Sequence, residues 1–366
     1  MRDDFHYPPD KAYFLSHSIG VQPKAVDAAL EEHFMAPWRR AEGDAWDYWL
    51  KALADFRKAL APLIGADARD ICQQTNISSA LSKCVFSLPE RDKRTKIVLT
   101  EEDFPTIGHV LAQTQRLGYE LVFLPGGEAL ADISGWEPAF RDDVHLLHVT
   151  HVFSNSALRP PVGDIIKRAR EAGVYTVLDV AQSAGAVPVD LNAWRPTFAT
   201  GTSVKYLCGG PGAAFLWANP DTIAECKPID VGWFSQDNPF PSHIHSFDYA
   251  SDAARFMGGT PAVAPFVCAA AAFKTLQKIG VDTIFQHNQL LLTRLIEALP
   301  PARVASHTDR NARGSSLIVT ADDLNATSKA LTKAGFAHDQ RMGGMRFSVH
   351  TYTSEEEIDA LVAALA

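Results

Sequence analysis

HLLHVT (His145–Thr150) and VYTVLDV (Val174–Val180) are two apolar segments of strand length, and both predict buried β-strands. Between them, Gly163–Ala172 has the apolar spacing of a helix, and Gly173 follows where a helix C-cap belongs. Strand, helix and strand at this spacing predict a βαβ unit and therefore a parallel sheet. A ligand of such a sheet binds at the carboxyl ends of the strands.

The flanking segments extend this sheet and add a second part. KIVLT (Lys96–Thr100) predicts a further buried strand. Thr197–Val204 and Ala213–Ala218 predict two strands that flank a Gly-Gly-Pro-Gly turn in a hairpin-like feature. From about Thr260 the chain becomes helical and rich in alanine, and Ser354–Ala366 predicts a helix that begins with a capping box.

Two domains are expected for a chain of 366 residues, since a domain holds roughly 100–200 residues. The main boundary is expected near Pro261. Residues 21–260 would form the larger, ligand-binding domain, and residues 261–366 a smaller C-terminal domain. Residues 1–20 are expected to pack on the smaller domain.

Composition narrows the classes of partner. The net charge of −9 at pH 7 argues against nucleic acid or an anionic membrane surface as a partner. No run reaches about 18 apolar residues, and the first residues do not resemble a signal peptide. The five cysteines form no C-x-x-C pair, which argues against a metal site or a disulfide framework and favours the reducing cytoplasm. They are Cys72, Cys84, Cys208, Cys226 and Cys268.

Asp179 and Lys205 are the two charged residues most closely tied to the predicted strands. Asp179 ends the apolar strand VLDV, where it could cap a helix or be a buried anion that needs a cationic partner, such as a protonated ring nitrogen. Lys205 follows an apolar run in TGTSVKY, where it could be solvated or could form a Schiff base with a lowered pKa.

Further polar and aromatic residues each allow two interpretations. Thr75 and Asn76 precede a helical segment and could cap it or hold a phosphate at its start. Phe104 follows the strand KIVLT and could be a core residue or a plate against a flat ligand. Arg346 and Arg255 lie in apolar surroundings, where each could be structural or could clamp a carboxylate.

Taken together, these segments resemble the class V aminotransferase superfamily, and within it kynureninase most closely. LDVAQSAGAVPVDL (Leu178–Leu191) is similar to the segment around the pyridinium aspartate of that family. TSVKYLCGGPGAAFLW (Thr202–Trp217) is similar to its lysine segment. Further matches are APLIGA at Ala61–Ala66, DFPT at Asp103–Thr106, GWF at Gly232–Phe234, RFMGGTP at Arg255–Pro261 and the C-terminal MRFSVHTYTSEEEID.

The resemblance implies an α/β fold, the fold type I of enzymes that depend on pyridoxal 5′-phosphate (PLP). That fold has a large domain with a mixed, mostly parallel seven-stranded sheet between helices, and a smaller α+β C-terminal domain. It also implies a homodimer with sites at the interface and an amino acid as small-molecule substrate.

The family's roles carry over to matching positions. Lys205 would hold PLP as a Schiff base and shuttle protons, and Asp179 would keep the pyridine nitrogen protonated. Gln182 would lie near the 3′-oxygen of the cofactor. Either Ser154 or Asn155 would face the same oxygen.

Other matching positions surround the ring and the phosphate. Phe104 would stack on the ring face. Thr75, Asn76 and Thr202 would hold the phosphate, and Thr260 would reach the phosphate of the neighbouring subunit.

Arg346 would bind the α-carboxylate of the substrate, and Trp233 would contribute to the substrate site. The chain also departs from the kynureninase pattern. Val204 replaces the tyrosine before the lysine, Ile107 replaces the acid of F-P-T-D, and Ser235 follows GWF where the family has glycine.

Two reactions remain open. A kynureninase-like hydrolase or lyase would cleave a side-chain bond of an amino acid, whereas an aminotransferase would pass its amino group to a keto acid. A cysteine desulfurase is less favoured, because Asp339–Met345 lacks a cysteine. A regulator of this fold would carry a basic DNA-binding segment, and a nicotinamide dehydrogenase would carry G-x-G-x-x-G after an early strand; neither feature is present.

Overall fold

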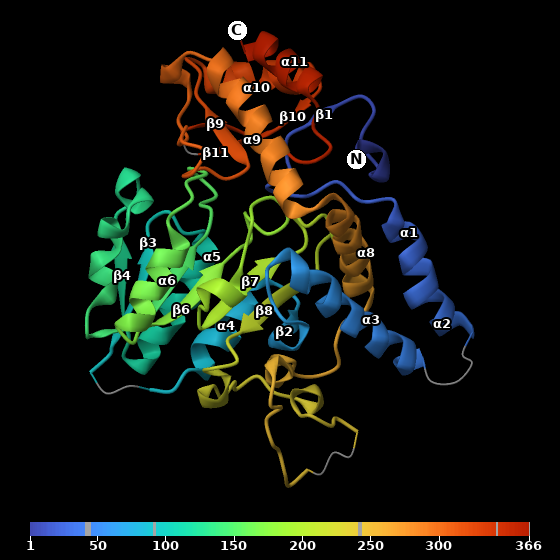
Figure 1. Cartoon of the computed structure of the whole chain (residues 1–366), viewed down its shortest axis with the longest axis vertical. Coiled ribbons are helices and arrows are strands. Elements are labelled where there is room, and N and C mark those ends of the chain that lie inside the picture. Colours follow the sequence, from blue (N-terminus) through green and yellow to red (C-terminus); the bar gives the residue numbers. More distant parts are fainter. Residues whose placement is uncertain (41–44, 91–92, 241–243, 342, 366) are drawn as a thin grey trace.

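A seven-stranded sheet lies at the centre of the computed structural model, which describes residues 1–40, 45–90, 93–240, 244–341 and 343–365. Its strands are β2 Ile71–Gln74, β3 Lys96–Thr100, β4 Glu120–Leu124, β5 Val144–Thr150, β6 Tyr175–Asp179, β7 Phe198–Thr202 and β8 Ala214–Ala218. They lie in the order β2-β8-β7-β6-β5-β3-β4 (Figure 1). β8 is antiparallel to β2 and β7, and all other neighbours are parallel. The predicted mixed, mostly parallel sheet is confirmed.

Helices cover both faces of this sheet. The helices before the C-terminal part are α1 Ala25–Leu30, α2 Ala36–Arg40, α3 Ala45–Leu60, α4 Ile77–Ser87, α5 Pro105–Leu111, α6 Val162–Glu171, α7 Leu191–Trp194 and α8 Ala264–Ile279. The predicted βαβ unit is β5, α6 and β6, and Gly173 after α6 has a φ of 68°. Only a residue that tolerates a left-handed backbone fits there, which explains the glycine.

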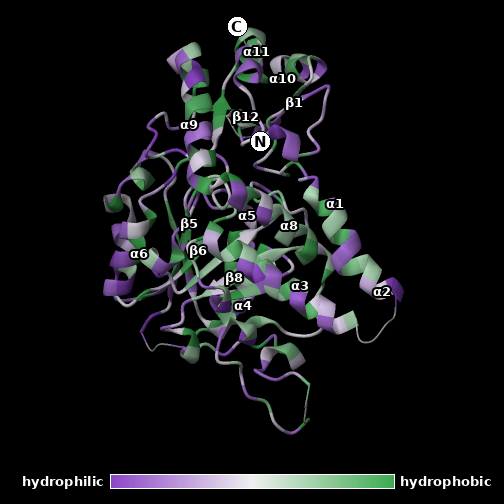
Figure 2. Ribbon diagram, turned by 45° about the vertical axis from the view of Figure 1, so that its right-hand side comes forward, coloured by the Kyte–Doolittle hydropathy of each residue, from purple (hydrophilic) through white to green (hydrophobic). Residues whose placement is uncertain are grey.

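The sheet has one apolar core on each face, because successive side chains of a strand point to opposite sides. Along β5, Leu147 and Val149 belong to the core that α3, α6 and α8 complete. Leu146 belongs to the other core, which Leu81 of α4 and Ile107 of α5 complete. Figure 2 shows hydrophilic and hydrophobic residues alternating along α3 and α6, as expected for helices with one buried side.

The C-terminal part of the chain forms a smaller α+β layer, which lies at the top of Figure 1. It comprises α9 Val281–Ala298, β9 Ser316–Val319, α10 Leu324–Lys333, β10 Phe336–Ala337, β11 Asp339–Arg341, β12 Gly344–Ser348 and α11 Glu355–Leu365. β12 lies between β11 and β9, antiparallel to both, over a separate apolar core. The capping box of α11 is confirmed, since Ser354 N–H donates to Glu357 Oε2 at 2.9 Å and Glu357 N–H donates to Ser354 Oγ at 3.3 Å.

The first residues lie against this C-terminal layer. β1 (Ala12–Tyr13) pairs parallel with β10, and Phe14 is buried in the C-terminal core. α8 begins just after residue 261, yet its Phe266 ring lies 4.8 Å from the Phe56 ring of α3. The division into domains of residues 21–260 and 261–366 stays a prediction.

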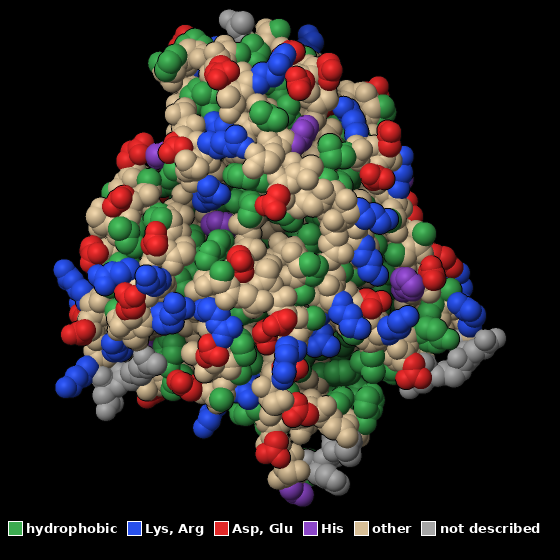
Figure 3. Space-filling view, in the orientation of Figure 1, with side chains coloured by type: hydrophobic (Ala, Val, Ile, Leu, Met, Phe, Trp, Pro, Cys, Tyr) green, Lys and Arg blue, Asp and Glu red, His purple; other side chains and the backbone are tan. Residues whose placement is uncertain are grey.

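The surface seen in Figure 3 carries lysine and arginine side chains interspersed with aspartate and glutamate. This face of the molecule therefore has no broad area of one charge. Within the part of the chain that the structure describes, no helix is both long and apolar enough to cross a membrane.

The N-terminal segment crosses the loop after β7 at Gly20, whose N–H donates to Val204 O at 2.8 Å. A Cβ at Gly20 would lie 2.2 Å from Lys205 O and 2.7 Å from Cys208 Sγ. Glycine is required here because the two backbones approach too closely for any side chain.

We expect Gly20→Ala to destabilise the protein by about 1–3 kcal/mol, the usual range for overpacking. Gly108→Ala is the matched control, because a Cβ in α5 meets nothing within 4 Å. It should be neutral or stabilise by about 0.5–1 kcal/mol, since alanine favours a helix over glycine. Urea unfolding of both variants measures the difference, and equal stability of the two would contradict the close approach at Gly20.

Candidate active site

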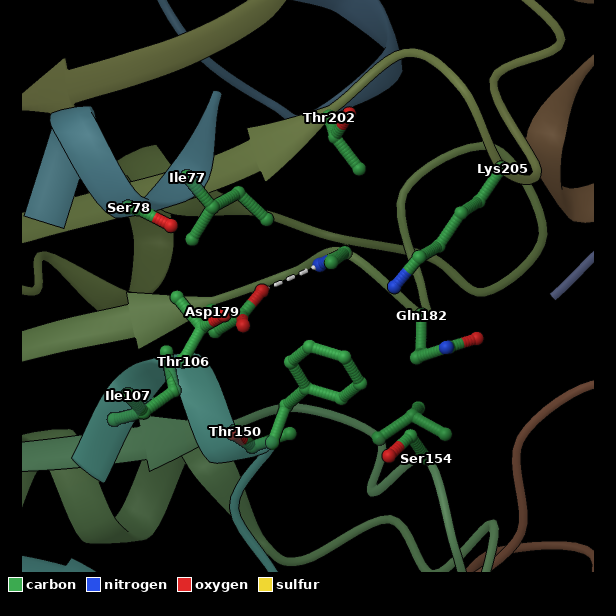
Figure 4. Close-up of a pocket in the computed structure, with 13 residues that line it drawn as sticks. Ile77, Ser78, Thr106, Ile107, Thr150, Ser154, Asp179, Gln182, Thr202 and Lys205 are labelled. Carbon is green, nitrogen blue, oxygen red and sulfur yellow. Dashed lines mark hydrogen bonds between the residues drawn. The ribbon is translucent and has the colours of Figure 1, made fainter. Parts of the chain in front are cut away.

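A cavity of about 200 Å³ lies at the carboxyl ends of three neighbouring strands. Thr150, Asp179 and Thr202, the last residues of β5, β6 and β7, line it together with Lys205. Figure 4 shows the side chain of Lys205 extending toward the space between Asp179, Gln182 and Thr202. The cavity is therefore at the edge of the sheet where a ligand was predicted.

Lys205 lies in the tight loop that follows β7. Its Nζ is 5.7 Å from the centroid of the ring of Phe104, the residue just before α5. Burial lowers the pKa of Lys205, the charges of Arg346 and Arg341 lower it further, and Asp179 opposes both. An amine with a lowered pKa is more often uncharged, as a nucleophile that attacks a carbonyl must be.

Asp179 is buried at the end of β6, where the backbone N–H of Ala181 donates to its Oδ1 at 2.7 Å. Burial raises the pKa of Asp179, while the charges of His148 and Lys205 oppose that rise. A carboxylate in this position has one short hydrogen bond and space toward the cavity. It is suited to bind a cationic group of a ligand.

Phe104, Gln182 and Thr202 also line the cavity, and their roles toward a cofactor stay predictions. Phe104 is 42% exposed, so one face of its ring is open to a ligand. Gln182 Nε2 donates to His17 O at 3.2 Å, which joins the N-terminal segment to the cavity wall. Of the residues expected near Gln182, Ser154 lines the cavity, whereas Asn155 borders a different hollow.

Thr75, Asn76 and Thr260 are placed differently. Asn76 is the N-cap of α4, and its Oδ1 accepts a hydrogen bond from Ser79 N–H at 2.8 Å. Thr75 and Thr260 line a second hollow and not the cavity of Lys205. The phosphate roles of these three residues stay predictions.

The first turns of α4 and α5 supply cavity residues that the sequence analysis missed. Ile77 and Ser78 begin α4, and Thr106 lies in the first turn of α5. Unpaired N–H groups at a helix start attract anions. Thr150 was also missed, although its place at the end of the strand beside Asp179 was a usable signal.

Arg346 lies on β12 and is 2% exposed. Its Nε and one terminal nitrogen bind the two oxygens of Asp339 at 3.0 and 2.7 Å, and its other terminal nitrogen donates to Ser154 O. Asp339 also lies 3.0 Å from His17 Nε2. Although burial raises the pKa of Asp339, the nearby His17 ring and the hydrogen bonds from Arg346 lower it well below its usual range. Arg346 is thus held by a carboxylate of its own chain, and its substrate role stays a prediction.

Trp233 and Arg255 lie away from the cavity. The Trp233 ring packs 4.4 Å from Phe234 and 6.3 Å from Trp46, and it does not line the cavity of its own chain. Its substrate role stays a prediction. Arg255 is buried and donates to the carbonyl oxygens of Ala250, Ile223 and Cys226, so it has the structural role.

Comparisons with known proteins agree on the family. A sequence profile described as aminotransferase class-V matches residues 13–361. An uncharacterized aminotransferase, YcbU of Bacillus subtilis (strain 168), is 26% identical over 96% of this chain and 92% of its own. A kynureninase of Deinococcus radiodurans is 28% identical over 100% of this chain and 92% of its own.

Solved structures share the fold. A cysteine desulfurase from Thermococcus onnurineus NA1 matches with a TM-score of 0.87 and 21% identity, over 99% of this chain and 95% of its own. A mutant of C-DES, with glycine covalently linked to its PLP cofactor, matches with a TM-score of 0.89 and 22% identity, over 100% of this chain and 98% of its own. At this identity the likeness shows the fold alone, and it confirms the predicted fold type. The chain belongs to the class-V aminotransferase family, whose members are pyridoxal-phosphate enzymes.

Proposed function

We propose that this enzyme binds PLP as a Schiff base on Lys205 and cleaves a side-chain bond of an amino acid, as a kynureninase-like hydrolase or lyase. The observation that carries the proposal is one cavity that contains the amine of Lys205, the buried carboxylate of Asp179 and the open face of Phe104. These are the groups that would hold the aldehyde carbon, the ring nitrogen and the ring face of PLP.

The residues fit this cofactor chemically. Asp179 would accept a hydrogen bond from the protonated ring nitrogen, and Phe104 would cover one face of the ring. The N–H groups at the start of α4, together with Thr202, would bind the phosphate. When bound, PLP withdraws electrons from the α-carbon of an amino acid. Lys205, with its lowered pKa, would accept the proton from that carbon.

The choice of side-chain cleavage rests on relatedness and on the placement of the cysteines. The kynureninase of Deinococcus radiodurans aligns with the whole chain. Cysteine desulfuration has less support, although cysteine desulfurases share the fold. None of the five cysteines lines the cavity, and four of them are buried. A thiol that attacks a substrate must reach it.

Transamination is the second candidate. Val204 stands where the kynureninase pattern has a tyrosine, and it precedes Lys205 directly. A valine cannot exchange a proton, so a step that depends on that hydroxyl is lost. Transamination needs only the proton transfer by Lys205. YcbU, the relative of similar identity, is named an aminotransferase.

The proposal includes a homodimer in the cytoplasm with two sites at the interface. Thr260 is exposed and lines the second hollow together with Thr75, and the proposal places it within reach of a neighbouring subunit. The five free cysteines suit a reducing compartment. Trp233 would enter the substrate site of the partner subunit rather than that of its own chain.

Lys205→Ala should abolish turnover and the absorption of the protein-bound Schiff base, because no other amine lines the described cavity. Borohydride reduction of the wild-type holoenzyme, followed by peptide mass spectrometry, should place the reduced cofactor on the peptide that contains Lys205. Lys96→Ala, at an ion pair with Asp143 away from the cavity, is the control and should keep the label on Lys205. A label on any other lysine would contradict the assignment.

Arg346→Ala should raise KM for the amino acid by about ten- to a hundredfold, the loss expected for a charge-assisted pair of about 1.5–3 kcal/mol. The Kd of PLP should stay within about threefold of the wild type. Arg346 is not proposed to contact PLP, so its removal should cost cofactor binding no more than one weak charge–charge interaction. Arg341→Ala is the matched control, because this more exposed side chain shares Asp339 as partner. It should change KM much less. If Arg346→Ala weakened cofactor binding and substrate binding equally, Arg346 would have only a structural role.

The two reactions differ in the fate of the cofactor. Mixed with kynurenine, a hydrolase should release anthranilate continuously while the visible absorption of the cofactor persists. An aminotransferase mixed with alanine or kynurenine should convert its cofactor once to the pyridoxamine form and then stop until a keto acid is added. Stopped-flow absorption together with anthranilate fluorescence separates the two. A single stoichiometric conversion would replace the first proposal with the second.

A further inference from the structure

A buried histidine and a second buried acid lie next to Asp179, outside the set of residues that line the cavity. His148 belongs to β5, and Asp103 follows β3. Their side chains are 0% and 2% exposed. No role in the proposed reaction uses either residue, yet burying two ionisable groups is costly unless they are paired.

The strand register brings His148 to the side of Asp179. β5 and β6 pair Thr150 with Asp179, and His148 with Val177. Because alternate residues of a strand share a face, His148, Thr150 and Asp179 point to the same side of the sheet. Asp103 joins them from the loop after β3, since its Oδ1 is 3.1 Å from His148 Nδ1 and accepts a hydrogen bond from Thr150 Oγ1 at 2.5 Å.

The hydrogen bonds fix Asp103 as an anion. It accepts from His148, from Thr150 and, through Oδ2, from Thr100 N–H at 2.8 Å. Burial raises the pKa of Asp103, but the charge of His148 and these hydrogen bonds outweigh it and lower the pKa overall. His148 therefore donates its Nδ1 proton to Asp103.

The other ring nitrogen of His148, Nε2, has no evident structural role. Nε2 is buried and has no hydrogen-bond partner among the described residues. Burial lowers the pKa of His148, but Asp103 and then Asp179 outweigh it, and the pKa is raised overall. A second proton on Nε2 would create one positive charge that interacts with both buried carboxylates, Asp103 and Asp179.

We infer that His148, held by Asp103, is a cationic positioning residue that keeps Asp179 ionised and thereby keeps the proton on the ring nitrogen of the bound cofactor. The inference rests on the proposed pairing of Asp179 with that nitrogen. Two buried carboxylates need two cations, and the histidine and the protonated ring supply them. Without the histidine charge, burial would favour the neutral acid at Asp179, which cannot hold the ring nitrogen protonated.

Few other groups can set the charge of His148. Lys205 faces Asp179 from the cavity. The apolar core on this face contains further titratable groups, namely Cys72, Cys84, Cys226 and Tyr175. Burial raises the pKa of each of the three thiols, so they stay neutral, and the Tyr175 hydroxyl donates to Glu225 at 2.9 Å. Asp103 and Asp179 are therefore the charges that determine the protonation of His148.

The first test reads the ring nitrogen directly, by ¹⁵N NMR of holoenzyme loaded with PLP labelled at that nitrogen. Wild-type enzyme should show a protonated nitrogen at pH 7. In His148→Gln, the pH at which the nitrogen loses its proton should fall by about one unit or more. This is the effect expected when one buried positive charge near Asp179 is removed. His151→Gln replaces another buried histidine near the end of β5 and should leave the wild-type signal. An unchanged midpoint in His148→Gln would overturn the inference.

The second test needs no cofactor and no substitution at His148. Histidine ring ¹⁵N signals of the wild-type apoenzyme, assigned by triple resonance, should show His148 doubly protonated at pH 7. Asp103→Asn should lower its titration midpoint by about one unit or more, because the variant removes the anion that receives the Nδ1 proton. A neutral His148 at pH 7 in the wild type would overturn the inference even if His148→Gln did not fold.

Asp179→Asn separates this inference from the proposed function. If it removes the proton from the ring nitrogen whereas His148→Gln does not, only the role of His148 fails. If Asp179→Asn leaves the nitrogen protonated, the proposed pairing of Asp179 fails, and the inference fails with it.

Discussion

A partly buried primary amine and a buried carboxylate in one cavity, at the edge of a parallel sheet, form the arrangement on which the rest of this structure depends. Neither Lys205 nor Asp179 can be placed there cheaply, because both lose water when the strands and helices close around them. The parallel order of β5, β6 and β7 places the strand ends side by side. Residues of the first turns of α4 and α5 line the same cavity. The carboxylate of β6 and the amine of the loop after β7 are thus brought to one cavity by neighbouring strands.

Much of the central sheet could be predicted because its strands are continuous apolar runs. Lys96–Thr100 matches β3 to the residue, and the strands of the βαβ unit differ from their predicted bounds by one residue at most at either end. β2 and β4 were not predicted. β2 ends in two glutamines, Gln73 and Gln74, whose amides are satisfied by Leu53 O and Phe256 O, contacts distant in sequence. β4 was missed although its apolar run LVFL ends at Pro125 and Gly126, which was a usable signal in the sequence.

Site residues could be predicted where the type of side chain indicates its chemistry. They could not be predicted where a residue belongs to the site only because of its position in the fold. Lys205, Asp179 and Phe104 are recognisable as an amine, an acid and a ring that follow strands. Ser78 and Thr106 contribute through helix starts, which any residue could occupy. Asp339 and Arg346 are a cross-strand pair of the β11–β12 hairpin, whose turn contains Gly343 with a φ of 92°. Recognising that turn would have paired them from the sequence.

The parallel pairing of β1 with β10 has a consequence for how the enzyme is made. Residues 12–13 find their partner strand at residues 336–337, more than 300 positions later. During synthesis on a ribosome, the first segment must therefore wait, exposed, until almost the whole chain has emerged. The same segment crosses the Lys205 loop at Gly20 and contacts Gln182 through His17. The residues that line the cavity all lie between Ile77 and Lys205, so this segment supports the Lys205 loop and Gln182 from outside the cavity. A truncated nascent chain can contain every lining residue and still lack that support.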